Sequence, residues 1–145
     1  KGKDMLPELL NEYDGKINVV FKQMPLSNHK WAKAAAVASL CSYEQSNDKF
    51  WKFHDTLFDK QKEIQLISAG KQFREIAQGA GLNMGKYDKC IKSEEVKAKV
   101  EADMKEAESI GVRSTPTFVI NGVIVPGANV QAVKNAIETR LSDAG

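Results

Sequence analysis

Apolar residues recur along this chain with two different periods, and the first stretch predicts a helix followed by a strand. Over residues 3–13 they fall on one helical face, although Pro7 should kink that helix because proline lacks the N–H of a helical turn. Asp14-Gly15 favours a helix end. Residues 17–21 read Ile-Asn-Val-Val-Phe, a short apolar run that predicts a buried strand.

Residues 28–92 are predicted to be helical throughout, and a longer charged helix follows them. Helical spacing of apolar side chains is clear over residues 31–41, 50–58 and 84–91 and weaker over residues 70–79. Suitable N-cap side chains precede three of these segments: Ser27 or Asn28, Asn47 or Asp48, and Asn83. The charged helix is expected to end at Gly111.

The last third of the chain contains the clearest hairpin signal. Apolar residues 117–120 and 123–125 flank Asn121-Gly122, and Asn-Gly supplies the two positive φ angles that a type I′ turn needs. A final amphipathic helix is expected over residues 130–141. The predicted order is helix, strand, helical block, strand, strand and helix, which is an α/β fold.

The composition is that of an ordinary globular protein and excludes several classes of function. The 145 residues contain 21 Lys and Arg against 19 Asp and Glu, a formal net charge of +2, and this length suits one domain. Only three residues are arginine, so a phosphate-binding surface is not expected and no nucleic-acid partner is predicted. No apolar run approaches the roughly 20 residues that span a bilayer, so no direct membrane insertion is expected.

The two cysteines, Cys41 and Cys90, are too few for a disulfide scaffold or a four-cysteine zinc site. They lie on different predicted helices, and two hypotheses stay open: a structural disulfide, or two buried free thiols. Neither has an evident activating base or helix N-terminus beside it, which argues against a catalytic thiol. The histidines, His29 and His54, have no partner at i, i+4 and no ligand cluster nearby, so no metal site is predicted.

Four stretches resemble the DsbA-like thiol–disulfide oxidoreductases, a family with the thioredoxin fold. They are the Pro7 helix with residues 17–21, the Ala-rich run to Cys41 with residues 49–55, the Tyr-Asp-Lys-Cys-Ile run at 87–91, and residues 111–122. The resemblance implies a thioredoxin-like core, β-α-β followed by β-β-α, with an inserted α-helical subdomain. Within one domain, residues 1–26 and 111–145 would form the core halves and residues 27–110 the insertion.

The sequence departs from the family in one respect. The family carries a Cys-x-x-Cys motif after its first core strand, and these 145 residues contain neither that motif nor that strand. No catalytic residue is therefore assigned, and the chain as printed is expected to lack exchange of the family kind. Because the missing strand would be central, we expect its place to be filled by residues before Lys1, by another chain or by a rearranged core. The first is favoured because Lys1 falls where the motif would end.

The resemblance also assigns a role to Ser114, Thr115 and Pro116. It implies a cis Thr115–Pro116 bond in a loop whose backbone pairs with a substrate peptide, which is strand addition through main-chain hydrogen bonds. The alternative is a proline that merely opens an edge strand.

By resemblance, the expected function is thiol–disulfide exchange on cysteine-containing polypeptides. The expected location is extracytoplasmic, in the periplasm or cell envelope of a bacterium, although no signal peptide is visible. A membrane redox partner belongs to this hypothesis, and no cofactor is implied beyond redox-active cysteines. The alternative is a redox-inactive peptide-binding module of thioredoxin-like fold, so enzymatic activity stays open.

Overall fold

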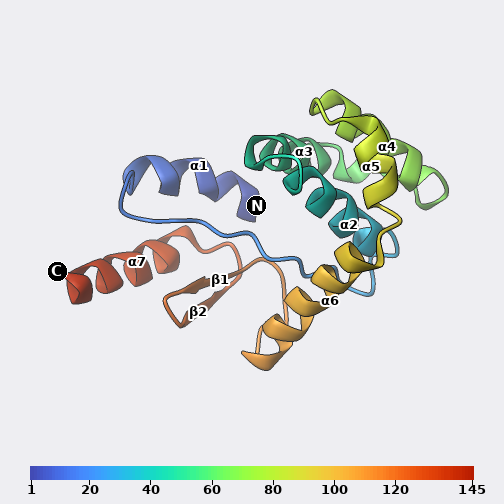
Figure 1. The fold of residues 1–145 in the computed structure, drawn as a ribbon. Coiled ribbons are helices and arrows are strands. Elements are labelled where there is room, and N and C mark those ends of the chain that lie inside the picture. The colour runs from blue at the N-terminus through green and yellow to red at the C-terminus, as the bar shows by residue number, and fades with distance from the viewer. The chain divides into compact units, whose positions relative to one another are not determined.

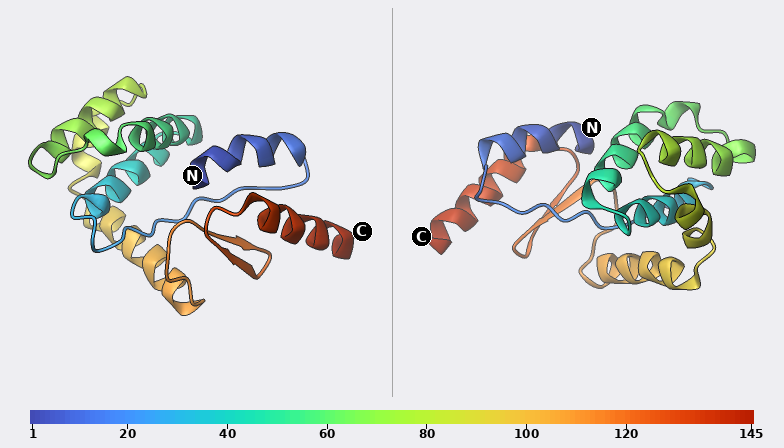
Figure 2. Two further views of the ribbon diagram at one scale, coloured as in Figure 1. Left: turned by 180° about the vertical axis from the view of Figure 1, so that it is seen from behind. Right: turned by 45° about the horizontal axis from the view of Figure 1, so that its top comes forward.

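Two separate hydrophobic cores form along the chain, one in each of two structural units. The computed structural model describes residues 1–145. Their contacts divide them into residues 1–22 with 106–145, here called the hairpin unit, and residues 23–105, the helical unit. Most of the chain is helical and its one sheet has two strands (Figures 1 and 2). The sheet is smaller than the α/β prediction required.

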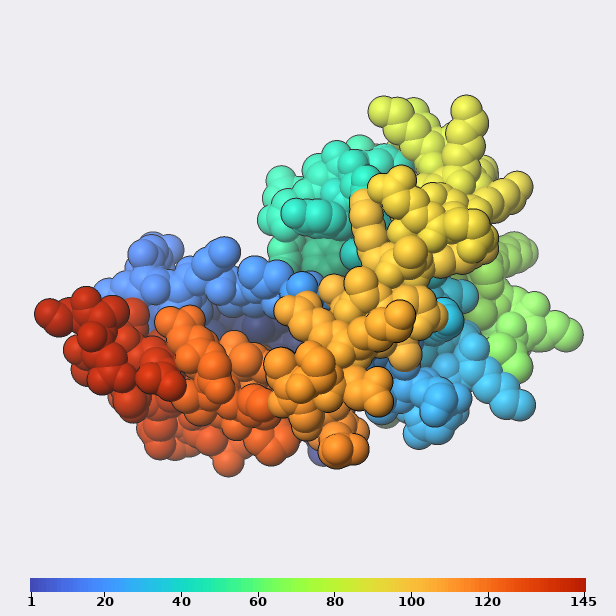
Figure 3. Space-filling model, turned by 60° about the horizontal axis from the view of Figure 1, so that its bottom comes forward, coloured from blue at the N-terminus to red at the C-terminus, as the bar shows by residue number.

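The hairpin unit packs two helices and a β-hairpin around one core. Helix α1 (Gly2–Glu12) opens it, strands β1 (Thr117–Ile120) and β2 (Val123–Pro126) form the hairpin, and α7 (Val130–Ala144) ends it. The buried core side chains are Met5, Leu9, Tyr13, Val125, Val133 and Ile137. In Figure 3 the blue atoms of the N-terminal residues lie beside the orange and red atoms of the C-terminal ones, so segments far apart in sequence build this core together.

The hairpin turn forms at Asn121-Gly122, as the sequence predicts. Asn121 has a φ of 45° and Gly122 a φ of 88°, the two positive values that a type I′ turn requires. The strands are antiparallel, and Ile120 lies opposite Val123. The prediction succeeded because the signal is local: two turn residues and the strands beside them.

The predicted strand at residues 17–21 is wrong, because this segment is extended but pairs with no other strand. Its side chains alternate as those of a strand do, with Ile17 and Val19 half-buried and Val20 68% exposed. The apolar pattern therefore identified an extended backbone correctly. A strand also needs a hydrogen-bonded neighbour, and the ladder of the hairpin joins only β1 and β2 (Figure 1).

Five helices and two short 3₁₀ turns make up the helical unit. The helices are α2 (Ala32–Tyr43), α3 (Asn47–Asp59), α4 (Ala69–Gly79), α5 (Met84–Cys90) and α6 (Glu94–Ser109), and the turns are Gln61–Glu63 and Leu66–Ser68. The last turn of α6 belongs to the hairpin unit. Three large side chains are buried at the centre of the helical core: Phe53, Phe73 and Tyr87. None of the helices has the length and apolar character that crossing a lipid bilayer requires.

The predicted N-caps hold at one helix of three. Asn83 caps α5, because its side-chain oxygen accepts a hydrogen bond from the Lys86 N–H at 2.9 Å. Helix α3 is capped by Ser46, the residue before the predicted pair. Helix α2 begins only at Ala32 and has no side-chain cap, since a backbone-bonded turn around His29 comes first.

A buried tyrosine in each core should make the protein lose stability at alkaline pH. Burial raises the pKa of Tyr87 to about 12, and burial together with a hydrogen bond to Glu138 raises the pKa of Tyr13 to about 12. An unfolded tyrosine ionises near pH 10, so the unfolded chain loses these protons first as the pH rises. The stabilisation is complete below about pH 10 and is lost between about pH 10 and 12.

Urea denaturation followed by circular dichroism at pH 9 to 12 should show this decline in unfolding free energy. Tyr13→Phe and Tyr87→Phe should each make the decline shallower, because phenylalanine has no proton to lose. A pH dependence that is identical in the wild type and in both variants would contradict the assignment.

Candidate functional site

The loop of Ser114, Thr115 and Pro116 lies directly before β1 and contacts the first turn of α1. The Thr115–Pro116 peptide bond is cis. A Cβ atom added to Gly2 would lie 2.8 Å from the Pro116 Cβ, closer than side-chain atoms approach one another. Glycine at this position therefore lets the Pro116 ring pack on the backbone of α1, which holds the loop at the start of that helix.

Two hydrogen bonds close the loop and leave its middle residue open. The Thr117 hydroxyl donates to the Ser114 carbonyl at 2.7 Å, and the Gly127 N–H donates to the Pro116 carbonyl at 2.8 Å. Thr115 is exposed, and its backbone N–H and carbonyl have no hydrogen-bond partner in the chain. Both groups are therefore free to pair with the main chain of a ligand.

Strand β1, which follows this loop, also has an open edge. Ile120 and Val123 flank the two-residue turn and so form a hydrogen-bonded pair. Alternate residues of an antiparallel ladder turn their N–H and C=O groups toward and away from the partner strand. The backbone groups of Thr117 and Val119 therefore point away from β2.

The outer edge of β2 is interrupted by contrast. Pro126 lies opposite Thr117, at a position where a backbone N–H would point outward, and proline has none. The outer edge of β1 is therefore the uninterrupted one in the residues described, and an added strand from this protein or from another chain would pair there.

Salt bridges and a hydrogen bond fix the helix on which the loop rests. Lys134 of α7 places its Nζ 2.5 Å from Glu8 Oε1 and 2.6 Å from Glu12 Oε2, both on α1. Hydrogen bonds to Glu12 and Glu8 raise the pKa of Lys134 above its usual value. The Tyr13 hydroxyl adds a 2.9 Å hydrogen bond to Glu138. Sequence reasoning missed this cluster, because Glu8 and Lys134 are 126 positions apart and no local pattern links them.

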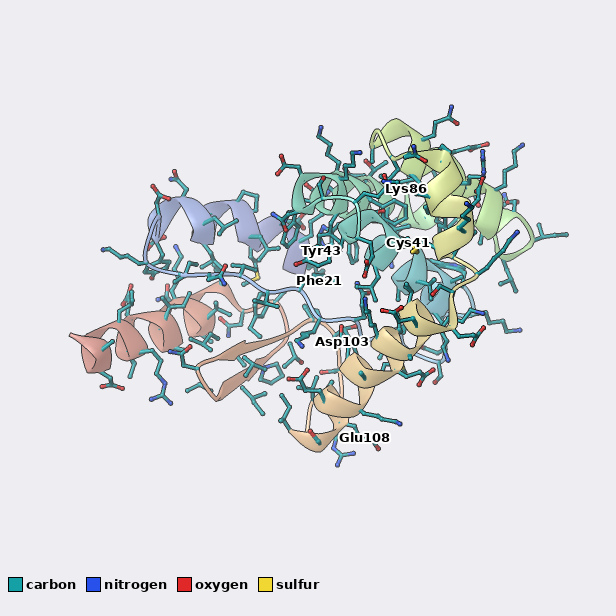
Figure 4. The ribbon with its side chains drawn as sticks, viewed as in Figure 1. Phe21, Cys41, Tyr43, Lys86, Asp103 and Glu108 are labelled. Carbon is teal, nitrogen blue, oxygen red and sulfur yellow. A yellow bond between two sulfur atoms is a disulfide. The ribbon has the colours of Figure 1, made fainter.

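Cys41 and Cys90 form a disulfide in the helical unit, with sulfurs 2.06 Å and Cα atoms 5.7 Å apart. The bond joins α2 to α5, and no free cysteine is left; it is the yellow bond beside the Cys41 label in Figure 4. The structure thus brings Ser114, Thr115 and Pro116 together in the hairpin unit, whereas both cysteines belong to the helical unit.

The histidines lie in different surroundings and neither joins a metal-binding cluster. His29 is exposed, and its ring centroid is 6.4 Å from that of Trp31. His54 is buried, with Nδ1 2.9 Å from Asp55 Oδ1 and its ring beside Phe58. No group of three or more His, Cys, Asp or Glu side chains could hold a metal ion.

Comparisons with known proteins match this chain to one family model and to several named relatives. A family model described as Thioredoxin matches residues 2–139. The probable disulfide bond formation protein D of Bacillus anthracis is 27% identical over 147 residues, which cover 94% of this chain and 64% of that protein. The disulfide bond formation protein D of Bacillus subtilis (strain 168) is 26% identical over 149 residues, which cover 95% of this chain and 64% of that protein. The chain thus spans just under two thirds of these relatives.

A further relative places a similar segment inside a much longer chain. The Na(+)/H(+) antiporter NhaA 3 of Salinispora tropica is 27% identical over 139 residues, which cover 94% of this chain but 20% of that protein. No solved structure matches the chain.

Proposed function

Because the chain belongs to the thioredoxin family, in its DsbA-like branch, we propose that it acts in thiol–disulfide exchange on cysteine-containing polypeptides outside the cytoplasm. Two of its relatives are named as disulfide bond formation proteins. Its own Cys41–Cys90 bond supports an oxidising compartment, since such bonds persist there and are rare in the cytosol.

The observation that carries this proposal is the loop of Thr115 and cis Pro116, in which the exposed Thr115 backbone has no partner, together with the neighbouring edge of β1 at Thr117 and Val119, which no described residue occupies. Main-chain hydrogen bonds along such an edge hold an extended peptide with little regard to its side chains. That property suits a protein that must accept many different polypeptides. The packing of Pro116 on Gly2 holds the loop at the start of α1.

Thiol–disulfide exchange needs thiolates that react and backbone groups that bind the polypeptide. A thiolate attacks one sulfur of a disulfide, a mixed disulfide forms, and a second thiolate releases it. The residues of this chain that contribute are those that bind and orient the peptide: the backbone of Thr115, Thr117 and Val119. We propose the same division of the chain as the resemblance implies, with residues 27–110 inserted between two core halves. The unit boundaries at residues 22 and 106 support it.

A matched pair of proline variants tests the edge. Val119 lies opposite Ile124 in the hairpin, and at neither position does the N–H point to the partner strand. Val119→Pro removes an N–H from the β1 edge, whereas Ile124→Pro removes one from the β2 edge, and both should keep the hairpin. We expect an unstructured cysteine-containing peptide, measured by calorimetry and by amide shifts of Thr115 and Thr117, to lose binding in Val119→Pro and to bind Ile124→Pro like the wild type.

Equal binding by both variants, or no binding by the wild type, would overturn the proposed site. Where binding is seen, two assays of the full-length protein distinguish an oxidoreductase from a redox-inactive peptide-binding module. They are the oxidation of a dithiol peptide and the reduction of insulin. Turnover supports the oxidoreductase. Binding without turnover identifies a redox-inactive peptide-binding module.

A further inference from the structure

The two cysteines of the disulfide differ in their access to solvent. Cys41 is 1% exposed and belongs to the buried cluster of the helical core. Cys90, the last residue of α5, is only partly buried and lines an open pocket of about 370 Å³ on the helical unit. A thiolate arriving from solvent therefore meets the Cys90 side of the bond.

The pocket carries charges of both signs. Lys86 and Lys89 line it from α5, where Lys86 lies one turn before Cys90 and Lys89 directly precedes it, and neither takes part in an ion pair. Lys86 is labelled in Figure 4. Lys99 lies between two carboxylates, 2.6 Å from Glu44 Oε1 and 3.5 Å from Glu95 Oε1. The pocket thus offers two unpaired cations and a carboxylate pair that shares one lysine.

We infer that the Cys41–Cys90 bond is a second redox site, which exchanges through Cys90 with small zwitterionic thiols. The carboxylates of such a thiol would pair with Lys86 and Lys89, and its ammonium group would pair with Glu44 and Glu95. Attack falls on the Cys90 sulfur because of its access to solvent, and the sulfur of the buried Cys41 is then the leaving group.

The exchange balances with two molecules of the small thiol. The thiolate of the first attacks the Cys90 sulfur, the Cys41–Cys90 bond breaks, and Cys41 leaves and takes a proton from water. The thiolate of the second attacks the small-molecule sulfur of the mixed disulfide, which releases a small-molecule disulfide and the Cys90 thiolate. Two electrons pass to the protein, and a small-molecule disulfide reverses both steps.

Glutathione is a suitable probe for the wild-type, oxidised protein. After brief exposure to glutathione, acid quenching and alkylation, peptide mass spectrometry should find the glutathionyl group on Cys90 and the alkyl group on Cys41. Among the single variants, native Cys41→Ala should form a mixed disulfide with glutathione disulfide. Native Cys90→Ala should react only after unfolding in urea.

The contribution of Lys86 and Lys89 to the rate of reduction is measured against a control pair of lysines outside the pocket. Lys86→Gln/Lys89→Gln should lower the rate of reduction by glutathione about 5-fold, as expected for two exposed ion pairs, and should leave reduction by uncharged 2-mercaptoethanol unchanged. Lys62→Gln/Lys71→Gln, which alters exposed lysines outside the pocket of the same unit, should change neither rate. Glutathione on Cys41, equal reactivity of the two cysteines, or reduction only after global unfolding would overturn the inference. The wild-type mapping decides it even where a variant fails to fold.

Discussion

The Cys41→Ala/Cys90→Ala variant should unfold with a free energy about 4 kcal/mol lower than that of the oxidised protein. The bond links residues 49 positions apart, and a cross-link of that span removes many conformations from the unfolded chain. Alanine is the suitable replacement because Cys41 is buried among apolar groups, where a serine hydroxyl would need a hydrogen-bond partner.

Tryptophan fluorescence during urea denaturation reports this loss selectively. Both tryptophans, Trp31 and Trp51, belong to the helical unit, so the signal follows the unit that contains the bond. Wild-type protein reduced with dithiothreitol should unfold close to the double variant, and the variant itself should not respond to dithiothreitol. A loss below about 1 kcal/mol, together with an intact mass two hydrogens above that of the oxidised chain for the untreated wild type, would show that the bond does not form.

The helices and the hairpin were predictable because their signals are local. Helical spacing located all of the long helices, and Asn121-Gly122 located the turn with its register. The segment at 17–21 shows the limit of the same method: alternating side chains specify an extended backbone, but pairing depends on a neighbouring strand that the pattern does not contain. The start of α2 was misplaced for a related reason, since backbone hydrogen bonds and not side chains shape the preceding turn.

The candidate site was predictable only in part. Ser114, Thr115 and Pro116 came from resemblance to a family, and no periodicity marks them. The contact of Gly2 with Pro116 and the ion pairs of Lys134 join residues more than 110 positions apart. Glycine at a helix start and lysine on an amphipathic helix are both common, so neither residue stands out until the fold brings its partner close. The sequence shows that Lys86 and Lys89 lie close to Cys90. It does not show that Cys90 lines an open pocket together with them, and the proposed role of the two lysines depends on that pocket.

The open edge of β1 depends on the small core beneath it, and this dependence gives the second large effect. A two-stranded hairpin is at best marginally stable by itself in water, so the edge exists because α1 and α7 pack against it. Leu9 of α1 is 2% exposed within that core, whereas its neighbour Leu10 is 44% exposed. The two leucines therefore form a matched pair on one helix.

Leu9→Ala should lower the unfolding free energy of the hairpin unit by about 2–5 kcal/mol, because it leaves a cavity in a core with few other side chains to close it. Leu10→Ala should change that free energy by no more than about 0.5 kcal/mol. Amide hydrogen exchange at Phe118 and Ile120 measures both effects within β1 itself, because the N–H groups of these residues bond across the hairpin. Peptide binding at the β1 edge should weaken in Leu9→Ala in parallel with the lost protection and stay unchanged in Leu10→Ala. If the hairpin amides of Leu9→Ala are as well protected from hydrogen exchange as those of the wild type, α1 does not stabilise the β1 edge. The prediction would then be wrong.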